Sequence, residues 1–243
     1  GGYYREKDSK QRVTDNILVG PADFDTYCIT APSDPRLPGG GGYQVCGLAN
    51  IKPAKFGQVA NVVKPTKDFG TDKRVNHFVS LGLNARLPGG ARVGGGLDTG
   101  RSSSDQCFVV DAPGLVAFRS ATSDFSQIAK GTATTIDGQP LCKVVTPFSA
   151  QTQVKLNGSL PLPKGFVVSG VYQDLAGIPI MATYAATTAE IAPSLGRNLA
   201  GGARTAAVPL VSPQTLFEDR TRRLDLRLTK NLQLTQRVRL QAN

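Results

Sequence analysis

The sequence predicts an all-β protein whose antiparallel strands, about seven of them, run up and down in chain order. Two features lead to this class. Long segments alternate apolar with polar residues, and short turns rich in Pro and Gly alternate strictly with long loops. Globular strands average only ~5–6 residues, whereas a strand that crosses a bilayer at a tilt needs ~9–11. We therefore expect a segment of an up-and-down transmembrane β-barrel, with short periplasmic turns and long extracellular loops.

The first strands differ in how clearly the alternation marks them. A strand over roughly 3–16 has a poor pattern, whereas "RVNHFVSLGLNARL" (74–87) places an apolar residue at nearly every second position. A turn at 88–91 follows it, and "VGGGLDTGR" (93–101) returns as the next strand. This pair predicts a hairpin with long arms.

The same cycle occurs twice more. The predicted elements are a strand at 151–160, a turn at 161–165, strands at 166–175 and 222–230, a turn at 230–236 and a last strand at 237–243. Long loops are expected at about 18–72, 102–150 and 176–219. At most one helical turn is expected in "TAEIAPSLGRNLAGGAR", because Pro193 and Gly196 interrupt it.

The alternation also predicts which residues share a face. In a barrel the apolar face contacts lipid and the polar face lines the lumen, so Leu224, Leu226 and Leu228 are expected to face lipid. Seven charged residues at polar positions are candidates for the lumen: Arg86, Asp98, Lys155, Arg223, Asp225, Arg227 and Arg239. The alternative for each of them is simple solvation without a specific role.

Composition excludes several classes. Apolar residues make up 40% of the 243, so the chain is not disordered by composition. It contains no apolar run long enough for a transmembrane helix, and its first residues lack the pattern of a signal peptide. The net charge is +10, but the Arg-rich end at 220–239 contains no aromatic residue, so a nucleic-acid partner is not expected.

The four cysteines suggest stapled loops. They are Cys28, Cys46, Cys107 and Cys142, and they permit three pairings that sequence alone does not distinguish. Because each successive pair lies within one long loop-like segment, Cys28–Cys46 and Cys107–Cys142 are the natural pairing, each stabilising by ~3 kcal/mol. Such disulfides imply an oxidising compartment. A zinc site is not expected, because no CxxC is present.

An enzyme is not expected. The triplet Asp98-Thr99-Gly100 resembles an aspartic-protease motif, but the required second carboxylate has no matching triplet. Asp, Thr and Gly are also what a strand-to-loop exit favours. His77 lies on the apolar side of a strand, and no GxSxG accompanies it. Asp23 and Asp25 alternate in the first long loop, where a turn is the default and a cation site the alternative. No cofactor is expected.

Several longer segments resemble a known family. They are "APSDPRLPGGGGYQVCGL" (31–48), "NARLPGGARVGGGLDTGR" (84–101), "CFVVDAP" (107–113), "IAPSLGRNLAGG" (191–202) and "RRLDLRLTKNLQL" (222–234). In this order they are similar to the C-terminal barrel of Oar-like TonB-dependent receptors. The resemblance covers most of the chain.

This resemblance implies an outer-membrane receptor of the Gram-negative type. Such a receptor captures a ligand on its outer loops and imports it when TonB pulls on a plug domain. Large polymers, peptides and glycans are all compatible ligands. Family barrels have about 22 strands, a size that holds a plug. We expect residues 1–243 to be a fragment, because they lack the plug, the TonB-contacting segment and a last strand ending in an aromatic residue.

A second hypothesis is a secreted or cell-surface structural or adhesive β-protein, stapled by disulfides. In that case Leu224, Leu226 and Leu228 would pack on a second sheet. Exposed aromatic residues are expected at membrane interfaces in a barrel. The candidates are Tyr3, Tyr4, Phe166, Tyr172 and Tyr184.

Overall fold

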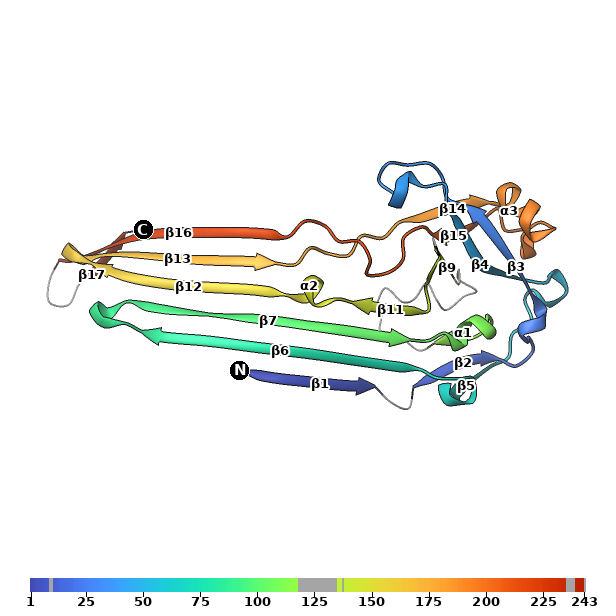
Figure 1. Ribbon diagram of the computed structural model, residues 1–243, viewed down its shortest axis with the longest axis horizontal. Coiled ribbons are helices and arrows are strands. Elements are labelled where there is room, and N and C mark those ends of the chain that lie inside the picture. The colour runs from blue at the N-terminus through green and yellow to red at the C-terminus, as the bar shows by residue number, and fades with distance from the viewer. Residues whose placement is uncertain (9–10, 118–134, 137, 235–238, 243) are drawn as a thin grey trace.

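The protein is all-β with antiparallel sheets, as the alternation predicts. The structure is a computed structural model, and it describes residues 1–8, 11–117, 135–136, 138–234 and 239–242. It is elongated: one sheet of long strands forms one end, and three small sheets with short helices form the other (Figure 1). We call these two parts the long sheet and the head.

The long sheet has eight strands, in the order β1-β6-β7-β12-β13-β16-β17, with β11 also paired to β7. Their bounds are β1 Gly2–Asp8, β6 Lys73–Arg86, β7 Arg92–Asp105, β11 Lys143–Thr146, β12 Gln153–Leu162, β13 Phe166–Leu175, β16 Thr221–Gln233 and β17 Arg239–Ala242. β12 and β11 pair with successive parts of the same edge of β7. Pro88–Gly90 and Pro163–Gly165 form the tight turns at the far end. Among the described residues β1 and β17 are the outermost strands and do not pair with each other, so the sheet is open.

The head consists of the segments that connect the long strands. Its sheets contain β3 Phe24–Thr30, β4 Gln44–Ile51, β9 Thr135–Ile136 and β10 Gln139–Pro140; β2 Arg12–Asn16, β5 Asn61–Pro65 and β8 Val116–Ala117; and β14 Thr183–Thr187 with β15 Thr205–Pro209. Its α-helices are α1 Phe108–Asp111 and α3 Thr188–Leu195, whereas α2 Phe148–Gln151 lies along the long sheet, between β11 and β12 (Figure 1). Short 3₁₀ turns lie at Pro21–Asp23, Pro38–Gly40, Pro53–Lys55, Thr66–Asp68 and Ala200–Gly202.

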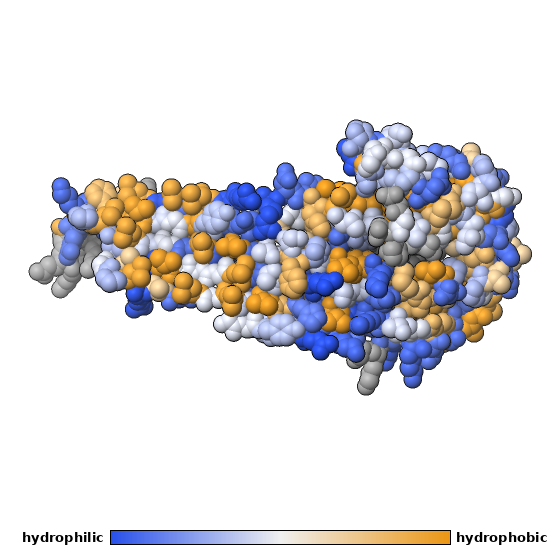
Figure 2. All heavy atoms as spheres, in the orientation of Figure 1, coloured by the Kyte–Doolittle hydropathy of each residue, from blue (hydrophilic) through white to orange (hydrophobic). Residues whose placement is uncertain are grey.

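The buried core lies in the head. The larger cluster joins β3 and β4 to α3 and β15, and it includes Ile29, Val45, Ile191 and Val208. A smaller cluster around Val13 and Phe108 lies where the head meets the long sheet. Along the long strands, by contrast, most apolar side chains reach the molecular surface, as the view in Figure 2 shows.

The loop and first-strand predictions need correction. The segments predicted as long loops contain the strands and helices of the head, and β7 continues to Asp105, beyond the predicted end of that strand. The strand predicted over 3–16 is two strands, β1 and β2, in different sheets. These elements are short and pair with distant segments, so local alternation does not reveal them. In addition, no helix among the described residues has the length and apolarity needed to cross a membrane.

The segment around Pro193 forms two helical turns rather than one. Thr187 and Glu190 make a reciprocal capping box at the start of α3, and Gly196 ends the helix in the left-handed conformation, with φ 76°. Pro193 is accommodated inside the helix. The cap satisfies backbone donors that would otherwise lack partners, and Ile191 packs into the head core, so tertiary contact outweighs the unfavourable Pro.

Both disulfides of the natural pairing are formed. Cys28–Cys46 joins β3 to β4, and Cys107–Cys142 joins the start of α1 to the segment before β11. Both lie in the head: Cys28–Cys46 holds connecting segments, whereas Cys107–Cys142 lies just beyond the paired ends of β7 and β11 and also ties these two strands.

The capping box predicts a pH dependence for the head. The hydroxyls of Tyr184 and Thr187 and the backbone N–H of Thr187 donate to the Glu190 carboxylate, and they lower the pKa of Glu190 below its usual 4.5. A lowered folded-state pKa means that this stabilisation is present above the unfolded-state pKa and is lost as the pH falls through the folded-state pKa. We therefore expect Glu190→Gln to reduce resistance to urea at pH 7 but much less at pH 3. The exposed Glu218 is the control, since Glu218→Gln should have little effect at either pH. An equal loss for Glu190→Gln at both pH values would contradict the assignment.

Candidate binding site on the polar face

One face of the long sheet is polar, and it carries the predicted lumen residues. The strand register places six of them on this face: Arg86, Asp98, Lys155, Arg223, Asp225 and Arg227. The seventh, Arg239, is paired through its backbone with Gln233, at a register position of the same face. Because side chains alternate strictly along a strand, one consistent register suffices to bring them together.

The Asp-Thr-Gly triplet is an ordinary part of this face. Asp98 lies in the interior of β7, not at a strand exit as predicted, and its carboxylate accepts a hydrogen bond from the Ser80 hydroxyl at 2.6 Å. Its cross-strand neighbours are Ser80 and Gln153, neither of which is a carboxylate. This setting lacks the paired acids of an aspartic protease.

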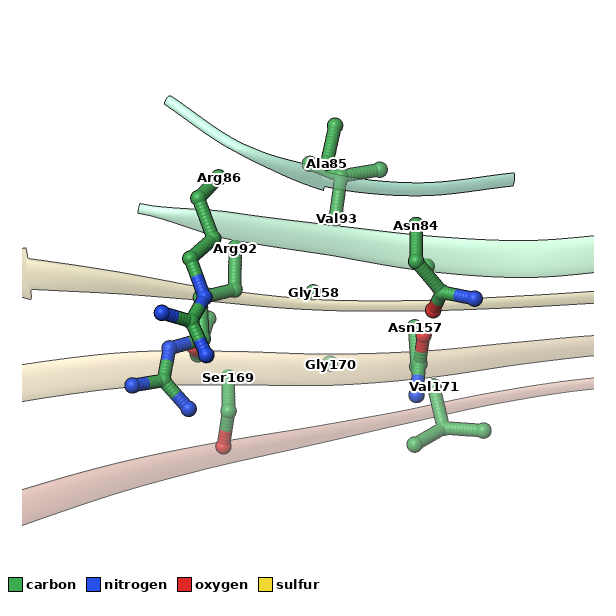
Figure 3. Close-up of a pocket in the computed structure, with 12 residues that line it drawn as sticks. Asn84, Ala85, Arg86, Arg92, Val93, Asn157, Gly158, Ser169, Gly170 and Val171 are labelled. Atoms are coloured by element: carbon green, nitrogen blue, oxygen red, sulfur yellow. The ribbon is translucent and has the colours of Figure 1, made fainter. Parts of the chain in front are cut away.

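The polar face has a hollow near the tight turns, with a volume of about 740 Å³. We call it the turn-end hollow. Arg86 and Arg92 are direct cross-strand partners there, and Figure 3 shows their guanidinium groups beside Ser169. Neither arginine has an ion-pair partner among the described residues. Like charges directly opposite one another are unfavourable, so this hollow is a cationic surface.

A second hollow, of about 460 Å³, lies where the polar face meets the head. We call it the junction hollow. Its floor is formed by side chains from β1, β6, β7, β11 and α2. Its lining residues include Asp8, Arg74, Asn76, Ser102, Ser104, Thr146, Gln151, Gly177, Pro179, Gln214 and Phe217. Pockets of 300–1,000 Å³ are typical of small-molecule sites.

Two segments that run antiparallel to each other form the roof of the junction hollow. Pro179 and Phe217 form an isolated antiparallel bridge. The backbone N–H of Ile180 donates to Leu216 at 2.9 Å, and that of Glu218 donates to Ile178 at the same distance. The roof therefore connects the long sheet to the head as a short ribbon.

Several polar atoms at the junction hollow are buried without a hydrogen-bond partner. They are Nε and Nη2 of Arg74, Oγ of Ser104 and Oε1 of Gln151. Gln151 uses its other amide atom, which donates to the Ser102 hydroxyl at 3.1 Å. An unsatisfied buried polar group costs about 1–3 kcal/mol, so each of these atoms indicates a place where a polar partner would stabilise the protein.

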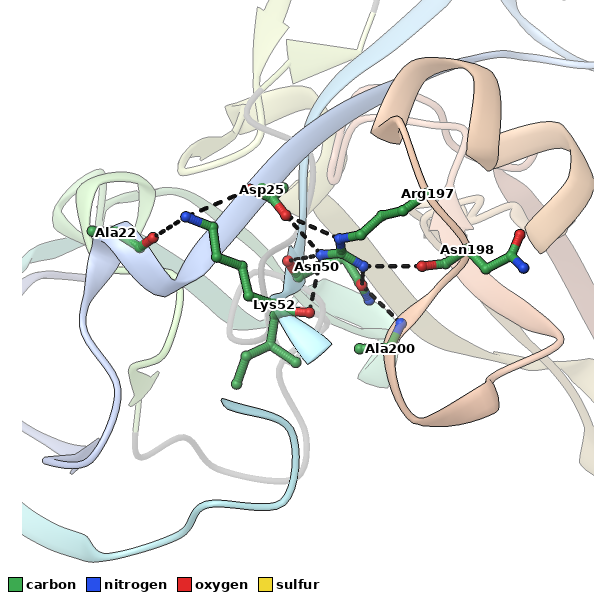
Figure 4. Close-up of polar contacts among 8 residues, drawn as sticks. Ala22, Asp25, Asn50, Lys52, Arg197, Asn198 and Ala200 are labelled. Atoms are coloured by element: carbon green, nitrogen blue, oxygen red, sulfur yellow. Dashed lines mark hydrogen bonds and ion pairs between the residues drawn. The ribbon is translucent and has the colours of Figure 1, made fainter. Parts of the chain in front are cut away.

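Asp23 and Asp25, the cation-site alternative, already have partners within the chain. Asp25 accepts hydrogen bonds from the Arg197 guanidinium at 2.9 and 3.0 Å and lies 3.9 Å from Lys52 (Figure 4). Asp23 accepts from the backbone of Gly20 and lies near a lysine. No group of three or more potential metal ligands exists among the residues with described positions.

Arg197 is the main polar link inside the head. Besides Asp25 it donates to the Asn50 side chain at 2.7 Å and to the backbone carbonyls of Asn50, Ile51 and Asn198. Asn50 in turn accepts from the backbone of Ala200. The network ties the segment after α3 to β3 and β4.

His77 and the aromatic residues have different environments from one another. His77 lies on the apolar face, where its Nδ1 is 2.6 Å from the Tyr3 hydroxyl. Phe166 lies at the tight turns, with the Lys230 Nζ 4.1 Å from its ring centroid. Tyr184 belongs to β14 in the head, so it is not at a strand end of the long sheet.

No family model, curated protein or solved structure matches this chain. The site is therefore defined by its own geometry. Sequence reasoning identified the polar face but missed the junction hollow, whose roof lies in a predicted loop. Arg74 follows the strand alternation and was the one available signal for it.

The Arg197 network predicts a strong effect on the stability of the head. Arg197→Ala removes six hydrogen bonds and leaves Asp25 partly buried, with 35% of its side chain exposed. After discounting for solvent screening, we expect a loss of about 2 kcal/mol in the free energy of unfolding. The control is Arg36→Ala, because the Arg36 side chain is 87% exposed and its pair with Asp34 is screened by solvent, so its loss should change stability little. Equal effects in urea unfolding would contradict the network's role.

The roof predicts a steric effect at Gly177. A Cβ atom there would lie 1.8 Å from the carbonyl oxygen of Glu218, so the two roof segments must separate in Gly177→Ala. We expect a loss of about 1–3 kcal/mol in urea unfolding. Gly20→Ala is the matched control, because a Cβ at Gly20 has no atom within 4 Å. A neutral Gly177→Ala would mean that the roof segments are not closely packed.

Proposed function

We propose that this chain is part of an outer-membrane TonB-dependent receptor, which binds a ligand on its extracellular side and imports it. The observation that carries the proposal is the opposite chemistry of the two faces of the long sheet. The polar face is hollowed and carries the charged residues. The other face is apolar over the part of the sheet nearer the tight turns, and no described element covers it there.

The apolar face is unsuited to water. Leu224, Leu226 and Leu228 are 63, 72 and 56% exposed. Their cross-strand partners on β13 are Tyr172, Gly170 and Val168, and the apolar surface continues through Leu156 and Leu160 on β12. Soluble proteins rarely expose contiguous apolar patches of this kind, whereas a barrel strand presents such a face to lipid.

Strand length supports a membrane environment. β6 and β7 have 14 residues each, β16 has 13, and β12 and β13 have 10. A tilted transmembrane strand needs ~9–11 residues. Phe166 and Lys230 at the tight turns resemble the aromatic and basic residues found at membrane interfaces.

The arrangement of connections also supports the proposal. Tight turns join the strands at one end, and the disulfide-stapled head joins them at the other. In an outer-membrane receptor the turns would be periplasmic and the head extracellular. Further strands would close the barrel at β1 and β17, and TonB would act on the plug domain that the family resemblance implies. The chain would carry no catalytic role.

The adhesive or structural alternative needs a second sheet over the leucine-bearing face. None of the described elements lies over Leu224, Leu226 and Leu228, which remain largely exposed. This exposure favours the membrane proposal over the soluble one.

A charge on the apolar face tests the proposal. We expect Leu226→Arg to destabilise the membrane-inserted state of the full-length protein by ~2–4 kcal/mol if Leu226 lies near the bilayer midplane. The measurement is the folded fraction recovered from outer membranes. The control is Val171→Arg, because Val171 is on the polar face opposite Asp225 and an arginine there stays in a polar environment. Normal assembly of Leu226→Arg, or equal failure of both variants, would rule out the lipid-facing assignment.

A further inference from the structure

We propose that the junction hollow is a binding site for a neutral polyhydroxylated ligand, that is, a saccharide unit. This inference names a ligand class for the proposed receptor. The role of the saccharide as an imported ligand rests on the proposed function, whereas its binding depends only on the side chains that line the hollow.

The hollow is enclosed by two separate layers. Strands of the long sheet form the floor, and the bridged segments at Pro179 and Phe217 form the roof. A ligand held between them would contact residues far apart in sequence, as in a preformed small-molecule site.

The unpartnered polar atoms match hydroxyl groups. Ser104 is 7% exposed, and its Oγ has no hydrogen-bond partner. Nη2 of Arg74 is a donor without a hydrogen-bond partner, and Oε1 of Gln151 is an acceptor without one. A hydroxyl group both donates and accepts, so a ligand that carries several hydroxyls can satisfy donors and acceptors together. A ligand with acceptors alone would leave the Gln151 oxygen unmatched.

The charge balance favours a neutral ligand over an anion. Nε of Arg74 lies 3.7 Å from Asp72, and Nη1 lies 4.0 Å from Asp8, which itself lines the hollow. These carboxylates offset the arginine, and they would repel an incoming carboxylate or phosphate. The turn-end hollow differs, because Arg86 and Arg92 have no such partner among the described residues. The junction hollow and the turn-end hollow, which lie on the same face, thus differ in charge.

The roof adds an apolar surface and a constrained polar residue. Phe217 and Pro179 provide the kind of apolar side chains on which the C–H face of a sugar ring packs. Gln214 has φ of 61°, which is uncommon for a residue other than glycine. Such conformations cluster at ligand-binding positions, and Gln214 is one of the residues that line the hollow.

The test is titration calorimetry of the full folded chain. The probes are glucose, galactose, N-acetylglucosamine, maltose and cellobiose, with glucuronate and inorganic phosphate as anionic probes. We expect at least one neutral saccharide to bind with saturable 1:1 heat and to bind more tightly than either anion. We expect Arg74→Lys, which loses the planar guanidinium fork, to weaken that binding at least tenfold.

Two further variants separate binding from folding. Gln214→Gly removes the amide but suits the left-handed backbone, so it should keep the fold and still weaken saccharide binding. Arg92→Lys makes the same substitution as Arg74→Lys on the same face, but in the turn-end hollow, and should leave binding unchanged. Formation of both disulfides reports folding.

The inference is overturned if no neutral saccharide of the panel binds. It is also overturned if the anions bind better, or if binding survives both Arg74→Lys and Gln214→Gly. Membrane assembly is measured separately with Leu226→Arg. A failure of saccharide binding with normal lipid-dependent assembly rejects only the ligand class, whereas binding without membrane assembly rejects only the receptor.

Discussion

The register of the long sheet is the constraint on which the rest of the structure depends. Side chains alternate between faces at every residue, so a slip of one position in any strand pair would move that strand's apolar set to the polar face. From β1 to β17 the pairing keeps one register. Six predicted lumen residues consequently share a face although they come from four strands. The same register explains the exposed leucines. They alternate with the polar residues along each strand, so they all lie on the opposite face.

The head and the long sheet are stabilised by different interactions. The head has the buried clusters, both disulfides and the Arg197 network. Most of the buried packing and cross-linking of the described residues is therefore in the head. The long sheet has continuous backbone pairing but few buried side chains among the described residues. Backbone hydrogen bonds contribute modestly in water, where the unfolded chain also hydrogen-bonds to solvent, and far more where water is absent. The proposed lipid contact on the apolar face would therefore stabilise the part of the chain that has little buried packing of its own.

The sequence predicted the long strands and the polar face well, because both follow from period-2 alternation that a strand displays locally. It failed where alternation stops being informative. Ser102, Ser103 and Ser104 are polar on both faces, so the end of β7 looked like a loop and Asp98 like a strand exit. Pro193 argued against a helix whose stability comes from the Thr187–Glu190 cap and from core packing. The junction hollow could not be predicted from local patterns, because its roof forms only when residues near 178 and 217 pair in the folded chain.

The two hollows show how the head changes the character of the polar face. At the tight turns, Arg86 and Arg92 meet without a carboxylate among the described residues, and the surface is cationic. Near the head, Arg74 lies on the same face of the sheet as Arg86. Asp72 lies beside it, however, with only 2% of its side chain exposed. Asp72 is held by Gln106, whose amide donates to both carboxylate oxygens at 3.0 and 3.1 Å. Gln106 is itself fully buried, next to the disulfide at Cys107. Two connecting segments therefore neutralise the strand arginine: the one before β6 supplies Asp72, and the one after β7 holds it through Gln106. These segments are not the two that form the roof, so the roof and the neutrality of the junction hollow depend on different connections that meet at this end of the sheet.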